Sequence, residues 1–184
     1  MAVEHSAITD PDVHEPKGAS TASSGRYYRA DGAGSGAWKP IHAYGEMYRQ
    51  AGSDSVAIDS ANVFHVLDSQ VTWTHDSLML ENVTFDSFFL TTTIAGDYRI
   101  SADVSFRGDS TAAVWAFSFA FDDSSLAKVQ TVEQLDSKVQ NVHLEVFSSL
   151  DSSETVKLQV RNETDVANII VEDALVHLIL LKAD

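Results

Sequence analysis

Four residues near the N-terminus carry side chains that could bind a metal ion: Asp10, Asp12, His14 and Glu15. Carboxylate and imidazole groups are common metal ligands, and here they stand at alternate or neighbouring positions. Pro11 and Pro16 interrupt the segment and hold the residues before them extended. A segment broken in this way gives no rigid cage, so the sequence predicts no metal site.

Catalytic side chains are the second kind of chemistry to look for. His177 lies in an apolar stretch, where a hydrogen-bonded core or interface histidine is a more ordinary role than a catalytic base. His65, His75 and His143 stand without a partner motif nearby. Neither a strained nucleophile turn nor a glycine-rich phosphate loop is present. The sequence therefore predicts that the protein is not an enzyme and has no cofactor.

Composition narrows the class of protein further. The chain has 184 residues, no cysteine and a net charge of −15, so disulfides and thiolate chemistry are excluded. Residues 1–49 hold five basic and six acidic side chains; the remaining 7 basic and 21 acidic ones give residues 50–184 a net charge of −14. Phosphate binding needs clustered Lys and Arg, so we expect no nucleic-acid partner. Without a long apolar run or a secretory signal, we also expect no membrane partner and synthesis in a cytoplasm.

The elements that position these residues fall into two regions. Residues 8–38 are rich in Ala, Ser, Gly and Asp and read as neither helix nor strand. From residue 44 onward, short apolar runs alternate with Asp, Ser, Asn and Gly breaks, as in a β-sandwich. The clearest strand is "GDYRISADVSFRGD", in which apolar and polar residues alternate strictly. Further strands are expected in "VQNVHLEVFSS" and "ETVKLQVRNET", and a helical turn is considered around residues 125–135.

Two predicted strands are apolar on both faces. "AAVWAFSFAF" has small residues on one face and aromatic rings on the other. "ALVHLILL" has Val176, Leu178 and Leu180 on one face, and Leu175, His177, Ile179 and Leu181 on the opposite face. An antiparallel sheet with one wet face does not need such strands, and an exposed aromatic patch of that size is rare on a monomer. We therefore predict that the second face contacts sister subunits; a closed barrel or a covering loop is the alternative. The predicted interface residues are Trp115, Phe117, Phe119, Phe121, His177, Ile179 and Leu181.

The order of these motifs resembles the C1q/tumour-necrosis-factor-like jelly roll. Gly45-Glu46-Met47 matches its opening strand, residues 95–106 match its "aGxYxvsaxvsf" strand, and residues 155–181 match its closing strand pair. The resemblance covers about residues 44–182. It implies an all-β jelly-roll sandwich that assembles as a homotrimer, preceded by an extended N-terminal arm, with domains at 1–43 and 44–184.

The arm has a resemblance of its own. "HEPKG" followed by "GAGSGAW" is similar to the N-terminal segment of small virion proteins of tailed bacteriophages. This implies attachment to the major capsid protein or another virion protein, and display on the exterior of the particle. The alternative is a linker whose aromatic residues have no role. The predicted anchor residues are Pro11, His14, Pro16, Lys17, Arg26, Tyr27, Tyr28, Arg29 and Trp38.

These resemblances lead to one functional expectation and one alternative. We expect a non-enzymatic capsid decoration or head-fibre protein attached through its arm. The alternative is a tail-fibre or receptor-binding module that contacts a host glycan. The loops near 107–112, 122–125 and 148–153 are mostly Asp and Ser and offer no aromatic platform for a sugar, which disfavours the alternative.

Overall fold

The computed structural model describes residues 26–32, 35–40, 42–50, 52–109, 112–122, 125–134 and 138–183. The chain divides into two compact units, Met1–Ile41 and His42–Asp184. In the first unit, β1 (Arg26–Gly32) pairs antiparallel with β2 (Ser35–Pro40). The prediction that residues 8–38 form neither helix nor strand is therefore wrong for β1 and for most of β2. Tyr and Trp favour paired, extended backbone. The predicted anchor residues Pro11, His14, Pro16 and Lys17 lie outside the described residues.

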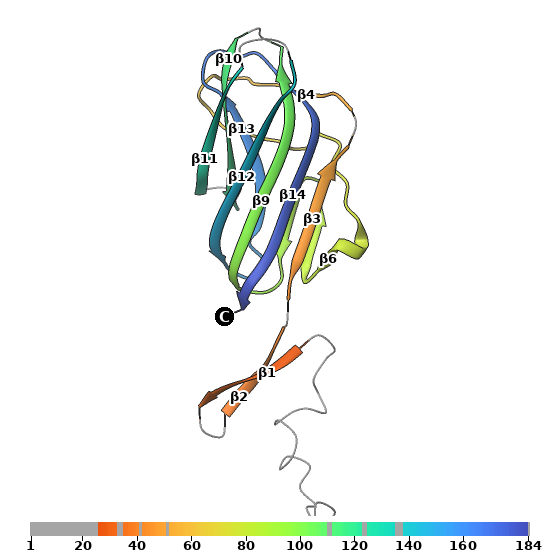
Figure 1. Ribbon diagram of the computed structural model, residues 1–184, viewed down its shortest axis with the longest axis vertical. Coiled ribbons are helices and arrows are strands. Elements are labelled where there is room, and N and C mark those ends of the chain that lie inside the picture. The colour runs from red at the N-terminus through yellow and green to blue at the C-terminus, as the bar shows by residue number, and fades with distance from the viewer. Residues whose placement is uncertain are drawn as a thin grey trace, which may run out of the picture. The chain divides into compact units, whose positions relative to one another are not determined.

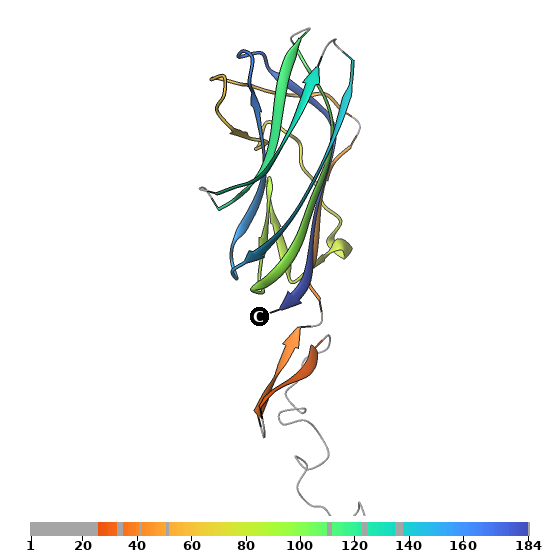
Figure 2. The ribbon, with the colours of Figure 1, turned by 60° about the vertical axis from the view of Figure 1, so that its left-hand side comes forward.

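The second unit consists of two antiparallel sheets packed face to face (Figures 1 and 2). The front sheet has the order β12-β9-β14-β3-β6, with β4 paired to β14. Its strands are β3 (Tyr44–Arg49), β4 (Asp54–Val56), β6 (Leu80–Glu81), β9 (Gly96–Gly108), β12 (Gln140–Leu150) and β14 (Ile169–Ala183).

The back sheet has the order β11-β10-β13-β8-β7, with β5 paired to β13. Its strands are β5 (His65–Val66), β7 (Val83–Asp86), β8 (Phe89–Thr92), β10 (Ala113–Phe121), β11 (Ser125–Gln134) and β13 (Thr155–Asn162). A short 3₁₀ turn, η4 (Ser77–Met79), precedes β6. The predicted all-β sandwich is confirmed, whereas the helical turn considered around 125–135 is strand β11.

The core lies between the two sheets and is built by period-2 alternation. In β9, Tyr98, Ile100 and Phe106 point inward and are fully buried, while the polar residues between them face outward. The Phe106 ring meets two aromatic rings of β10, with its centroid 4.8 Å from Phe117 and 6.1 Å from Trp115. Aromatic side chains suit this space because sheets pack about 10 Å apart.

The four aromatic residues of β10 point into this core. Trp115, Phe117 and Phe119 have exposed fractions of 0%, and Phe121 of 7%, within the single chain. The prediction that they form the outer, subunit-contacting face of their strand is therefore wrong. The alternate residues Ala116, Ser118 and Ala120 form the outer face and are covered as well. When both faces of a strand are apolar, alternation separates them but does not say which one points inward.

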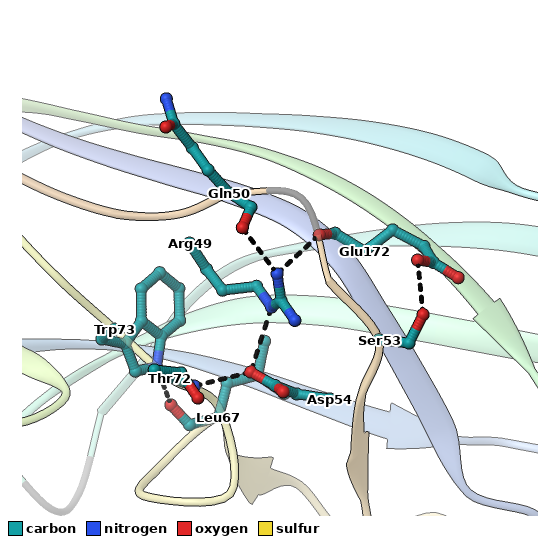
Figure 3. A network of polar contacts seen from close by, with 8 residues as sticks. All are labelled: Arg49, Gln50, Ser53, Asp54, Leu67, Thr72, Trp73 and Glu172. Carbon is teal, nitrogen blue, oxygen red and sulfur yellow. Dashed lines mark hydrogen bonds and ion pairs between the residues drawn. The ribbon is translucent and has the colours of Figure 1, made fainter.

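A buried arginine links the end of β3 to β4 and β14 by hydrogen bonds (Figure 3). Arg49, at the end of β3, donates from Nε to Asp54 Oδ2 at 3.0 Å. Its Nη1 donates to the carbonyl oxygens of Gln50 and Glu172, at 3.0 and 3.1 Å. Asp54 Oδ2 also accepts the backbone N–H of Thr72 at 2.7 Å. The guanidinium and the carboxylate both have partners, which is what burial of an arginine requires.

The network also sets the acidity of its carboxylate. Burial by itself would raise the pKa of Asp54, but the hydrogen bonds from Thr72 and Arg49 lower it below its usual value of 3.8. Asp54 is therefore held in its charged form beside the guanidinium.

Candidate subunit interface

The outer face of the front sheet combines exposed apolar residues with paired charges. Strand register places Phe147 of β12 opposite Arg99 of β9, Arg99 opposite Ile179 of β14, and Ile179 opposite Tyr44 of β3. These four residues form one row across the sheet, which we call the Phe147 row. Phe147 is 64% exposed and Ile179 is 39% exposed. Leu181, further along β14, is 55% exposed.

The next row carries charges that are satisfied within the chain. It consists of Glu145, Ser101, His177 and Glu46 on the same four strands. His177 Nε2 lies 2.8 Å from Glu46 Oε2. Arg99, in the Phe147 row, donates from Nε to Glu145 Oε2 at 2.6 Å. The side chain of Glu46 is only 17% exposed. Charges paired in this way can be covered by another protein surface without leaving an isolated ion.

Two more histidines on the outer side of this sheet pair with carboxylates. His143 Nδ1 lies 2.8 Å from Asp103 Oδ1, in the row that follows the His177 row away from Phe147. His42 Nε2 lies 2.6 Å from Glu81 Oε2 of β6. The two residues of each pair are 40 and 39 positions apart in sequence. Long-range strand pairing brings His143 opposite Asp103 and places His42, just before β3, near Glu81 of β6.

Two open hollows lie on this face. The larger, of about 660 Å³, extends from Glu46 and Tyr48 across Asp103 and His143. The smaller, of about 420 Å³, is lined by Tyr44, Gly45, Glu46, Met79, His177 and Ile179. We call it the β3 hollow. Within the described residues, no three His, Asp or Glu side chains converge in a way that could hold a metal ion.

The predicted interface residues separate in the structure. His177, Ile179 and Leu181 lie on the outer face of β14, as the alternation predicts, whereas the four aromatic residues of β10 lie in the core. The role of His177, Ile179 and Leu181 as subunit contacts is not tested by the fold and stays a prediction. Of the predicted anchor residues in the first unit, Arg26, Tyr27, Tyr28 and Arg29 lie in β1 and Trp38 lies in β2.

Sequence reasoning missed Phe147. It lies on β12, in the predicted strand "VQNVHLEVFSS", where Val142 and Leu144 are buried in the core. The available signal was an aromatic residue at a position that the same alternation assigns to the solvent face. Leu78 and Met79 of η4, 80% and 40% exposed, were missed because a 3₁₀ turn has no clear periodic signature.

Comparison with known proteins identifies the fold. No protein-family model matches the sequence, and no curated protein is similar to it in sequence. Among solved structures, Eiger TNF from S. frugiperda matches with a TM-score of 0.52 and 12% identity, over 77% of this chain and 95% of that one. Murine APRIL, in structures at pH 5.0 and pH 8.0, matches with a TM-score of 0.51 in each case. The identities are 9% and 8%, over 76% of this chain and 99% of those chains.

These matches show that the second unit is a tumour-necrosis-factor-like jelly roll. The jelly roll expected from the sequence motifs is therefore confirmed. Identities of 12% and below carry the fold and nothing more. No helix in the described part of the chain is long and apolar enough to cross a membrane.

Proposed function

We propose that this chain is a non-enzymatic structural protein of a virus particle, a capsid decoration or head-fibre protein that assembles as a homotrimer. The outer face of the front sheet is the subunit interface, and residues 1–43 attach the trimer to the capsid. The homotrimer is also the assembly implied by the C1q/tumour-necrosis-factor resemblance of the jelly roll.

The observation that carries the assembly is the set of exposed apolar residues on this face. Phe147 and Ile179 lie in the Phe147 row on either side of Arg99, and Leu181 lies further along β14; all three are exposed. Large aromatic and aliphatic residues of this kind contribute most of the binding energy in protein interfaces. The neighbouring charges of Arg99 and Glu46 are already paired within the chain, so covering them costs less.

The attachment to a virus particle is supported by the sequence of residues 8–38 and its resemblance to phage virion proteins. In the first unit, β1 and β2 form an antiparallel pair that carries Tyr27, Tyr28 and Trp38. A trimer presents three such arms, and effective concentration then strengthens a weak contact with the capsid.

The test compares the full chain with residues 42–184, which contain a complete hydrophobic core of their own. Light scattering gives the mass of each form, and co-sedimentation with capsid shells that lack this protein measures attachment. We expect both forms to be trimers and only the full chain to pellet with shells. A monomeric full chain would refute the trimer, and a trimer that never pellets with shells would refute the decoration role.

A further inference from the structure

We propose that Phe147 of each subunit is seated in the β3 hollow of the next subunit, beside Ile179 and Met79. The proposal rests on the homotrimer proposed above and names the contact that closes it. A ring of three subunits needs a heterologous interface, in which one patch of each copy meets a different patch of its neighbour. Phe147 and the β3 hollow are such a pair of patches.

The geometric basis is that the two patches lie in one row. Strand β12 forms one edge of the front sheet, whereas β3 lies towards the other edge (Figure 1). Phe147 belongs to β12, and the hollow is lined mainly by residues of β3 and β14. The register Phe147–Arg99–Ile179–Tyr44 places them at the same level along the strands. Rotation about an axis parallel to the strands keeps that level unchanged. A rotated copy therefore brings its Phe147 to the level of the hollow.

The two patches also match chemically. Phe147 is the aromatic residue with the largest exposed fraction, 64%, among the exposed large hydrophobic residues of the described chain. The hollow has a volume of about 420 Å³ and presents Ile179 and Met79, which are themselves 39% and 40% exposed. An aromatic side chain buries about 150–250 Å² when it is covered. Seating Phe147 here covers exposed apolar surface on both partners.

Charge complementarity fixes the orientation of the contact. Arg99, next to Phe147 in the Phe147 row, binds Glu145 through Nε and Nη2. A guanidinium has five N–H donors, so further donors remain for a second carboxylate. Glu46 lines the hollow and contacts His177 through Oε2, which leaves Oε1 for such a donor. In the assembled ring, Arg99 of one subunit faces Glu46 of the next.

Cross-linking tests the contact directly, because the chain contains no cysteine. The variant carries Phe147→Cys together with Met79→Cys, which are exposed to mild oxidant and to a short bismaleimide. Within one chain, Phe147 lies on β12 and Met79 directly precedes β6, so the two are separated by about four strand spacings, or about 19 Å, which is too far for a disulfide. The matched control combines Phe147→Cys with Val166→Cys, a residue 57% exposed in the loop after β13.

We expect denaturing gels to show a shift from single chains to covalent dimers and trimers in the test variant and no shift in the control. Covalent dimers from Phe147→Cys alone would overturn the proposal, because Phe147 would then meet its own copy. A native trimer that shows no cross-links in the test variant would likewise overturn it and leave the trimer intact. A wild-type chain that light scattering finds monomeric would overturn both proposals.

Replacing Phe147 by cysteine removes its phenyl group and could by itself dissociate the trimer. A pair of charge substitutions therefore tests the same contact in a second way. Phe147→Lys and Ile179→Glu should each abolish the trimer, since each places a charge against an apolar patch. In the double variant, every interface brings the introduced lysine of one subunit against the introduced glutamate of the next, so light scattering should again give a trimer. Failure of the double variant to recover any trimer, when both single variants remain folded by circular dichroism, would contradict the contact.

Discussion

The position of Phe119 can be tested by truncating it to alanine and comparing the result with the same truncation at Phe147. Phe119 is 0% exposed and is paired in the back sheet with Leu158 of β13. Removing a fully buried phenyl ring typically lowers the free energy of unfolding by about 3–5 kcal/mol. Domains are stable by only about 5–15 kcal/mol, so this is a large fraction of the total.

The control removes an identical group from the surface. Phe147 is 64% exposed in the single chain, and truncation of an exposed residue changes the free energy of unfolding by about 0.5 kcal/mol or less. Phe147→Ala should instead weaken the trimer. The two variants therefore separate a core role from an interface role with the same chemical change.

The assay is unfolding in guanidinium chloride, followed by circular dichroism at several protein concentrations. Several concentrations are needed because the stability of an oligomer depends on concentration. For Phe119→Ala we expect a midpoint shifted to lower denaturant at every concentration, and a melting temperature about 10 °C lower. A Phe119→Ala protein that keeps its unfolding midpoint but dissociates on dilution would refute the core placement and restore the outer-face prediction.

Three further predictions concern the polar network and one close contact. Arg49→Met removes a buried guanidinium and leaves the partly buried Asp54 carboxylate without its ion pair, so the free energy of unfolding should fall by about 3 kcal/mol in denaturant titrations. Asp54 has a lowered pKa in the folded state, so it binds fewer protons there than when unfolded; stability should fall as the pH drops from about 4 downward, and Asp54→Asn should flatten that slope in melting curves recorded at several pH values. Gly108→Ala would place a methyl group 2.5 Å from Trp115 Cζ2, and calorimetry should show a loss of about 1–3 kcal/mol, whereas an unchanged melting temperature would mean that the ring moves freely.

The alternation of β9 shows how far local sequence reaches. Tyr98, Ile100 and Phe106 were expected on one face, and they lie in the core with the polar residues opposite. The residues of β14 follow the same rule: Val176 points inward, and Ile179 points outward. Side chains of a strand point alternately to its two faces, so the pattern fixes two sets of residues without any knowledge of the partners.

The orientation of β10 shows where this reasoning stops. Trp115 and Phe119 form one apolar set and Ala116 and Ala120 the other, and both sets are buried. Which set enters the core depends on the volume available between the two sheets, and that space exists only when they are packed.

The outer face of the front sheet depends on tertiary structure even more. The sequence by itself determined the all-β class, the strand alternation and the exposure of Ile179 and Leu181 on β14. Only the tertiary structure placed Phe147 in one row with Ile179, and His177 beside Glu46, 131 positions away in sequence. Alternation is a property of each strand alone, whereas neighbours across a sheet are set by register and strand order, which come from long-range pairing.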